Sequence, residues 1–250
     1  SGKDFGSYDY ELVRRPKVLA LAGEGVRSHN LGEIWHFFEE ELRYPIDLIE
    51  ASEISTVALE SYNVIVLTEG YYSIGESTME KINDWVSAGG RLVAIGSAIN
   101  KLSGKDGFEI ESKGTPEPDT SEKEPPVHHP EPYAGSDRRS MSDDIPGSIF
   151  QTTLDTTHPL CFGLGETYWT LKSTTSNYQW LEEGGNAIYL DDSPRYYGFV
   201  GYRALEKTKN TLIAGQEQIG GGSVVYFVDN PMFRSFWNSG KVLFSNALFF

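Results

Sequence analysis

The sequence has very little cysteine: one residue, Cys161, in 250. A single cysteine excludes an intrachain disulfide and a zinc site built mainly from thiolates. Cys161 lies between Leu160 and Phe162, and a lone cysteine between apolar neighbours is typical of a small buried hydrophobe. We therefore expect Cys161 to serve packing rather than catalysis.

Basic residues are also scarce. The chain has 21 Lys+Arg against 36 Asp+Glu, which gives a formal net charge of −15 at pH 7. This charge repels the phosphate backbone of nucleic acids and the surface of anionic lipids. The sequence also has no apolar run that approaches the roughly 18 residues needed to span a bilayer. We therefore predict that the protein binds no nucleic acid and does not insert into a membrane.

A signal peptide is not recognisable at the start of the sequence. The opening SGKDFGSYDY has no basic region followed by an apolar one. We expect the sequence to start at a cut in a longer chain. The missing signal peptide therefore does not indicate a cellular compartment.

Strand and helix patterns alternate over the first hundred residues. The expected strands are short apolar runs, and the expected helices have apolar residues at helical spacing. The order is strand 17–22, helix 31–43, strand 46–50, strand 62–68, helix 74–88 and strand 91–96. Strands joined by helices of this length form a parallel, doubly wound sheet. We therefore predict a flavodoxin-like α/β fold with three layers and a mostly parallel central sheet.

The composition changes after residue 102. Residues 103–132 contain six prolines and eight acidic residues against three lysines. Such a segment cannot bury enough apolar surface to offset its ordering entropy, so we predict a long, partly disordered acidic insertion within a single domain of residues 1–250. The apolar pattern from residue 149 onward predicts mainly strands, followed by a last helix. They are strands 149–154, 168–171, 187–190, 211–217 and 223–228, and helix 240–250.

Four sequence blocks carry a resemblance to a known family. They are GEGV…GEIWH (23–36), AGGRLVAIG (88–96), LDTTHPLCFG (154–163) and DNPMFRSFW (229–237). Together they run through nearly all of the chain outside the acidic insertion, and the last two are the most specific. The sequence resembles a domain found at the C-terminal end of bacterial zinc carboxypeptidases of the carboxypeptidase A-like family. The resemblance implies the class I glutamine-amidotransferase-like fold.

The same resemblance implies an accessory role in a larger, exported protein. Its partner would be the peptidase domain of the same parent chain, on which it would pack or to which it would help to present substrate. The zinc and the hydrolysis would belong to that peptidase domain, so no cofactor is expected in this one. The parent would be found in the periplasm or outside the cell.

The residues that make an amidotransferase catalytic are absent. Active members of the fold carry a cysteine on the tight turn after the strand equivalent to 91–96, where backbone N–H groups can hold an oxyanion. That position is Gly96 here, and Ser97 follows it. The base is a histidine in a His-Pro step after the last strand, but this chain has Asn230 before Pro231. We therefore predict no catalysis by this chain, and a residual hydrolase with Ser97 as nucleophile remains as an alternative.

Polar side chains follow several of the predicted parallel strands. Ligands of doubly wound sheets bind beyond the carboxyl ends of the strands. The side chains expected at this edge are Glu24, Ser28, His29, Asn30, Glu69, Tyr71 and Arg234. Arg234 could hold a ligand carboxylate, although we favour an internal salt bridge with Glu24 or Glu69. A binding module for a small molecule or a carbohydrate is therefore the alternative to an accessory domain.

Two histidine patterns resemble metal ligands. His36 and Glu39 have the His-x-x-Glu spacing of carboxypeptidase zinc sites, with His158 as a distant third candidate. Their place inside a helix that is expected to pack on the sheet argues against a zinc site. The pair His128-His129 lies in the acidic insertion, where a solvated loop is the simpler interpretation. We predict no metal site in this chain.

Overall fold

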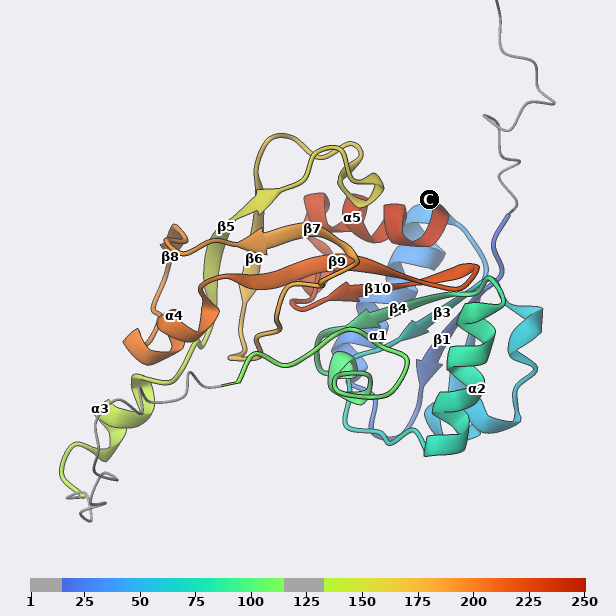
Figure 1. The fold of residues 1–250 in the computed structure, drawn as a ribbon, viewed down its shortest axis with the longest axis horizontal. Coiled ribbons are helices and arrows are strands. Elements are labelled where there is room, and N and C mark those ends of the chain that lie inside the picture. The colour runs from blue at the N-terminus through green and yellow to red at the C-terminus, as the bar shows by residue number, and fades with distance from the viewer. Residues whose placement is uncertain (1–14, 115–132) are drawn as a thin grey trace, which may run out of the picture.

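The computed structural model describes residues 15–114 and 133–250 (Figure 1). The strands of these residues are β1 (Val18–Ala22), β2 (Ile46–Glu50), β3 (Val64–Leu67), β4 (Arg91–Ile95), β5 (Ser148–Leu154), β6 (Tyr168–Lys172), β7 (Gly185–Leu190), β8 (Tyr196–Tyr197), β9 (Thr211–Ile219) and β10 (Gly222–Phe227). They form one ten-stranded sheet in the order β2-β1-β3-β4-β10-β9-β7-β5-β6, and β8 pairs with β5.

The sheet has a parallel half and an antiparallel half. Strands β2, β1, β3, β4 and β10 run parallel to one another. Strands β9, β7, β5 and β6 are added to β10 through antiparallel pairings. The parallel half, with its helical crossovers, is the doubly wound arrangement that the first hundred residues predict. The prediction of the fold class is therefore confirmed.

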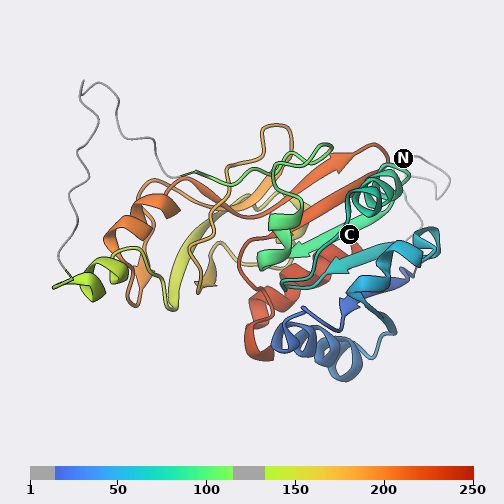
Figure 2. The ribbon, with the colours of Figure 1, turned by 90° about the horizontal axis from the view of Figure 1, so that it is seen from below.

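Helices cover both faces of the parallel half. The longer ones are α1 (Ser28–His36), which continues as a π-helix (Phe37–Leu42), α2 (Glu76–Ser87) and α5 (Asn238–Phe249), and two shorter ones are α3 (Ser136–Met141) and α4 (Tyr202–Thr208). Short 3₁₀ turns occur at Ala51–Thr56, Leu59–Ser61, Gly96–Lys101, Pro159–Cys161 and Phe233–Ser235. Figure 2 shows α1 and α5 on one face of the sheet and α2 on the other. Over the described ranges, every helix is too short or too polar to cross a bilayer.

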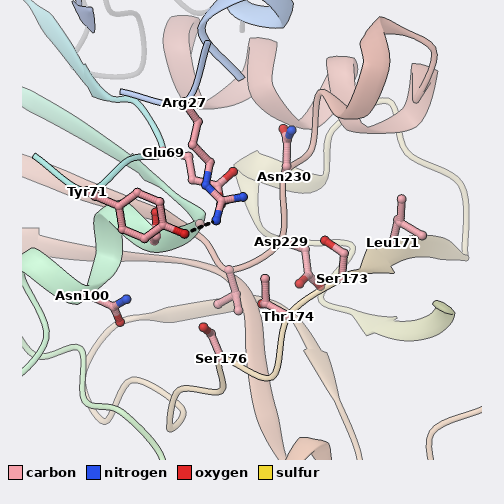
Figure 3. Close-up of a pocket in the computed structure, with 13 residues that line it drawn as sticks. Arg27, Glu69, Tyr71, Asn100, Leu171, Ser173, Thr174, Ser176, Asp229 and Asn230 are labelled. Carbon is pink, nitrogen blue, oxygen red and sulfur yellow. Dashed lines mark hydrogen bonds and ion pairs between the residues drawn. The ribbon is translucent and has the colours of Figure 1, made fainter. Parts of the chain in front are cut away.

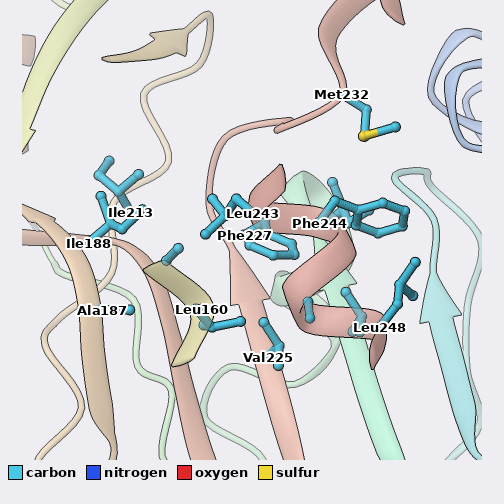
Figure 4. Close-up of a cluster of buried hydrophobic side chains, with 14 of the residues drawn as sticks. Leu160, Ala187, Ile188, Ile213, Val225, Phe227, Met232, Leu243, Phe244 and Leu248 are labelled. Atoms are coloured by element: carbon cyan, nitrogen blue, oxygen red, sulfur yellow. The ribbon is translucent and has the colours of Figure 1, made fainter. Parts of the chain in front are cut away.

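Successive side chains of the parallel strands supply two separate cores. In β1, Val18 and Ala20 belong to the core beneath α1 and α5, whereas Leu19 and Leu21 belong to the core beneath α2. The same alternation holds in β3, β4 and β10. Figure 4 shows part of the first core, where Phe244 of α5 packs against side chains of the sheet. Because both faces are covered, these strands contain runs of consecutive apolar residues rather than apolar residues at alternate positions only.

The predicted elements are present, with differences at their ends. The strand predicted at 46–50 has the same bounds as β2, but the helix predicted at 31–43 begins earlier and becomes a π-helix in its last part. The sequence does not predict α3, α4 or β8, because these elements are too short for a periodic apolar pattern to be recognised.

The beginning of the predicted insertion is packed against the rest of the fold. Phe108 and Ile110 are buried in the core beneath α2, and Ser112 forms a β-bridge with Tyr178. Residues 103–132 are predicted as a partly disordered insertion, whereas its first part is ordered because these two apolar side chains among the acidic ones are buried. His128-His129 lies outside the described residues.

The antiparallel half bends back over the end of β10. In the sheet order, β9, β7 and β5 lie between β10 and β6. Nevertheless, the Thr170 hydroxyl donates to Asp229 Oδ2 at 2.9 Å, and the indole N–H of Trp237 donates to the Trp169 carbonyl at 2.8 Å. Strand β6 therefore faces the segment that follows β10, and this arrangement places a second wall beside the carboxyl ends of the parallel strands.

Candidate functional site

A crevice of about 260 Å³ lies at the carboxyl ends of the parallel strands (Figure 3). Its lining consists of Arg27, Glu69, Tyr71, Gly96, Ser97, Asn100, Leu171, Ser173, Thr174, Ser176, Val228, Asp229 and Asn230. Figure 3 shows Arg27, Glu69 and Tyr71 on one side and Asp229, Ser173 and Thr174 on the other. This is the edge of a doubly wound sheet at which ligands bind.

The first wall is a cluster of Arg27, Glu69 and Tyr71. The loop before α1 and the loop after β3 are joined by hydrogen bonds from Arg27 N to Glu69 O (2.8 Å) and from Tyr71 N to Gly25 O (2.7 Å). One guanidinium nitrogen of Arg27 lies 3.5 Å from Glu69 Oε1, and another donates to the Tyr71 hydroxyl at 2.6 Å. The side chains of Arg27 and Glu69 are 45% and 13% exposed. Glu69 is therefore a largely buried carboxylate with a half-exposed cation beside it.

The environment of Glu69 disfavours its charged form. Burial raises the pKa of Glu69, the Arg27 guanidinium opposes this rise, and the negative charges of Glu33 and Asp229 add to it. A carboxylate of this kind gains more from an additional hydrogen-bond donor than a fully hydrated carboxylate does. Glu69 is thus a group that a ligand hydroxyl or N–H would stabilise.

The second wall depends on a buried ion pair. Lys172 Nζ lies 3.5 Å from Asp229 Oδ1, and the two side chains are 0% and 3% exposed. Lys172 also donates to the Ser176 carbonyl at 2.8 Å. Burial raises the pKa of Asp229, while the charge of Lys172 and the hydrogen bond from Thr170 oppose this rise. The pair fixes the loop of residues 173–176 to the end of β10.

The turn after β4 carries Gly96 and Ser97, the two residues considered for the nucleophile position. Gly96 has a φ of 55°, in the left-handed region that glycine adopts without strain. The next hydroxyl, Ser97 Oγ, accepts from Gly70 N at 3.0 Å and donates to Gly70 O at 3.2 Å. Both hydrogen bonds that Ser97 Oγ makes in the described part of the chain therefore go to one glycine, and they join the loops after β3 and β4.

Asn230, at the position expected for a catalytic base, forms hydrogen bonds within the fold. Asn230 Nδ2 donates to Glu33 Oε2 at 2.6 Å, and Asn230 Oδ1 accepts from Met232 N at 2.9 Å. The other oxygen of Glu33 accepts from Arg234 N at 2.6 Å. The amide of Asn230 therefore ties α1 to the segment after β10.

The structure brings together some of the predicted cleft residues. Glu69 and Tyr71 line the crevice. Asn30 is buried behind them and accepts the backbone N–H of Glu69 at 3.0 Å. Three others are exposed and lie outside the lining, namely Glu24, Ser28 and His29.

Arg234 has a different environment from the predicted one. Its guanidinium lies over the Phe233 ring, 5.3 Å from the centroid, and its φ is 49°. Glu69 pairs with Arg27 instead, and within the described ranges no ion pair joins Arg234 to Glu24 or Glu69. The predicted salt bridge of Arg234 is therefore wrong, because its guanidinium lies over the neighbouring ring.

Sequence reasoning missed much of the second wall. Ser173, Thr174 and Ser176 come from the hydroxyl-rich run STTS (173–176), which follows β6, an antiparallel strand. Ligand sites of doubly wound sheets are expected at the ends of parallel strands, and this run follows a strand of the antiparallel half. The high density of hydroxyl residues was the signal that could have identified it.

The histidine and cysteine candidates lie outside the crevice lining. His36 Nδ1 is 3.5 Å from Glu41, and the ring of His158 accepts a backbone N–H at the start of a 3₁₀ turn. Among the described residues, no three His, Cys, Asp or Glu side chains are grouped closely enough to hold a metal ion. Cys161 is 3% exposed, its thiol donates to the Ala187 carbonyl, and burial raises its pKa to about 11. This thiol packs as a hydrophobe.

Comparison with known proteins reveals similarity of fold. No family model and no curated protein sequence matches the chain. A ThuA-like protein from Parabacteroides merdae has a TM-score of 0.56 at 14% identity, over 94% of this chain and 89% of that one. A glutamine amidotransferase from Thermotoga maritima has a TM-score of 0.52 at 10% identity, over 94% and 97%. A β-galactosidase from Bacillus circulans has a TM-score of 0.53 at 13% identity, over 93% of this chain and 30% of the enzyme.

These similarities define the class of the domain. The chain has the class I glutamine-amidotransferase-like α/β fold, which is shared with ThuA-like proteins. At identities this low, the likeness concerns the fold alone. The zinc carboxypeptidase parent stays a prediction from the sequence blocks.

We expect Lys172→Met to destabilise the protein strongly. The substitution leaves Asp229 buried without its cation, which costs about 3–5 kcal/mol of unfolding free energy. Lys209→Met is the matched control, because Lys209 pairs with Glu206 at the surface, where such pairs contribute less than about 1 kcal/mol. Urea unfolding followed by circular dichroism measures both losses. Equal losses in the two variants would contradict the buried ion pair.

We expect Glu69→Gln to stabilise the protein at pH 7. The folded-state pKa of Glu69 lies above its ordinary value of 4.5, so the folded protein binds this proton more tightly than the unfolded chain does. The stability contributed by this group therefore falls as the pH rises from about 4.5 through the folded pKa. Glutamine does not ionise and therefore does not lose stability in this way. The gain in unfolding free energy over the original protein is thus largest at neutral pH and becomes smaller toward pH 4.

Thermal unfolding at pH 4 and pH 7 measures this effect of Glu69→Gln. Glu80→Gln, at an exposed position of α2, controls for the loss of one negative charge. A Glu69→Gln variant that is less stable than the original protein at pH 7 would contradict the direction of the pKa shift.

Proposed function

We propose that the chain is a non-catalytic accessory domain of an exported zinc carboxypeptidase-like protein. The observation that carries the non-catalytic part is the elbow after β4, where Gly96 stands at the nucleophile position. The accessory part is supported by the β-galactosidase, in which the similar region makes up 30% of a larger enzyme. The sequence blocks 154–163 and 229–237 support a zinc carboxypeptidase-like parent, because they carry the most specific part of the resemblance.

The local packing favours the absence of a nucleophile. Acyl transfer needs a nucleophilic side chain with a base in hydrogen-bond reach. A Cβ placed on Gly96 would lie 3.0 Å from Glu69 Cδ, so a cysteine there would require the carboxylate to move. Ser97 and Asn230 are bound to Gly70 and Glu33. The residues around the elbow thus stabilise the fold instead of activating a nucleophile.

The proposal assigns the zinc and the hydrolysis to the peptidase domain of the parent chain. That domain would be the partner of this one, in the periplasm or outside the cell, and this domain would need no cofactor. The net charge of −15 supports a role without nucleic acid and without insertion into a membrane.

The test compares the full product of the gene with residues 1–250 alone. We expect zinc-dependent release of C-terminal residues from peptides by the full product, and neither this activity nor ammonia release from glutamine by the shorter chain. We also expect a His-x-x-Glu peptidase sequence upstream in the gene.

Two results would overturn the proposal. An upstream region without a peptidase domain would refute the proposed parent. Turnover of either substrate by the shorter chain would refute the non-catalytic role, and Ser97→Ala, with the exposed Ser77→Ala as control, would then show whether Ser97 is the nucleophile.

We propose small-molecule binding in the crevice as a second function. It is favoured by the largely buried Glu69, which faces the hydroxyl-rich loop across the crevice. The volume of about 260 Å³ is slightly below the range of about 300–1,000 Å³ typical of sites for drug-sized molecules. The ligand would therefore be small. The two functions are compatible, because an accessory domain can present a ligand to its partner.

A further inference from the structure

The charged side chains that line the crevice have partners of opposite charge within the chain. Glu69 pairs with Arg27 and Asp229 pairs with Lys172, each at 3.5 Å. Glu33 lies outside the lining and accepts two hydrogen bonds of 2.6 Å from neutral N–H groups. A ligand with a net charge would leave one charge without a partner in a partly enclosed site, which costs free energy. The charge balance therefore favours a neutral ligand.

Hydrogen-bonding groups of both kinds line the crevice. The hydroxyls of Ser173, Thr174 and Ser176 can each donate and accept, whereas the Glu69 carboxylate only accepts and the Arg27 guanidinium only donates. A ligand that satisfies all of these groups needs several polar atoms that both donate and accept. Hydroxyl groups have this property, and a ring that carries several of them presents them on different sides.

An aromatic ring stands at the rim of the crevice. Tyr71 is 77% exposed, although its hydroxyl accepts a hydrogen bond of 2.6 Å from Arg27. The Arg27 guanidinium also lies 5.2 Å from the centroid of the Tyr71 ring. Tyrosine combines an apolar face with a polar tip, and the C–H face of a sugar ring packs on such a surface.

The hydroxyl-rich loop is held in place from within the protein. Lys172 is fully buried and donates to the Ser176 carbonyl while it pairs with Asp229. A loop that is already ordered loses less entropy when a ligand binds. The second wall is therefore preorganised for binding.

We propose that the crevice binds one neutral sugar ring. Its hydroxyls donate to Glu69 and exchange hydrogen bonds with Ser173, Thr174 and Ser176, while its apolar face packs on Tyr71. The volume of about 260 Å³ limits the ligand to a small unit such as a single ring. This inference rests on small-molecule binding, the second function proposed above, and names the class of its ligand.

The experiment titrates residues 1–250 with single-ring sugars by isothermal titration calorimetry at pH 7. The panel contains the neutral hexoses glucose, galactose and mannose, the anion glucuronate, the cation glucosamine, and glutamine as a ligand that is not a sugar. We expect saturable binding of at least one neutral hexose. The two charged sugars should bind about tenfold more weakly or worse, because their charge has no free partner in the crevice.

Two variants locate the binding site. Glu69→Gln should weaken binding of the neutral hexose about tenfold, because a hydrogen bond to a charged acceptor is replaced by one to a neutral amide. Glu80→Gln, on the surface of α2, should leave binding unchanged. Because Glu69→Gln is expected to stabilise the fold at this pH, a loss of affinity in this variant cannot be attributed to unfolding, and thermal unfolding of each variant checks this point.

Three outcomes would overturn the inference. Binding of glucuronate, glucosamine or glutamine without any neutral hexose would refute the ligand class and leave small-molecule binding intact. No saturable binding by any member of the panel would refute both. Hexose binding that Glu69→Gln leaves unchanged would refute the proposed site.

Discussion

The buried ion pair between Lys172 and Asp229 joins the two halves of the molecule. Lys172 ends β6, at the edge of the antiparallel half, and Asp229 follows β10 in the middle of the sheet. Removing two charges from water is tolerated only when they are paired and hydrogen bonded. Thr170 and the Ser176 carbonyl supply those hydrogen bonds. The pair therefore fixes the separation of the two walls, and the crevice depends on it.

A glycine at the turn after β4 leaves room for Glu69 in the first wall. A side chain on Gly96 would meet Glu69, because its Cβ would lie 3.0 Å from the carboxylate carbon. Without that side chain, Glu69 packs against the turn and faces the opposite wall. Gly96, which the sequence resemblance puts at the nucleophile position, thus makes room for a buried carboxylate. The same glycine would therefore account for both the proposed loss of catalysis and the proposed binding site.

The sequence predicts the parallel half well because its signals are local. The run 64–67 is apolar at every position, and the structure covers it on both faces. The topology then locates the edge at which Glu69 and Tyr71 meet. The second wall has no local signal, because the path of β6 is set by contacts such as Thr170 with Asp229, far apart in the sequence. The choice of ion-pair partner is equally non-local: Glu69 pairs with Arg27, whereas the Arg234 guanidinium lies over the Phe233 ring.

The most direct test is the pKa of Asp229 in the folded protein. Nuclear magnetic resonance can follow the carboxyl carbon of this residue during a pH titration, with Asp229→Asn to assign the signal. We expect a pKa above the ordinary value of 3.8, because burial outweighs the charge of Lys172 and the hydrogen bond from Thr170. Lys172→Met should raise this pKa further, because the substitution removes the cation that opposes the effect of burial. An Asp229 pKa that is the same with and without Lys172 would mean that the two side chains do not pair. In that case the ion pair would not hold β6 over the end of β10, and the crevice would not depend on it.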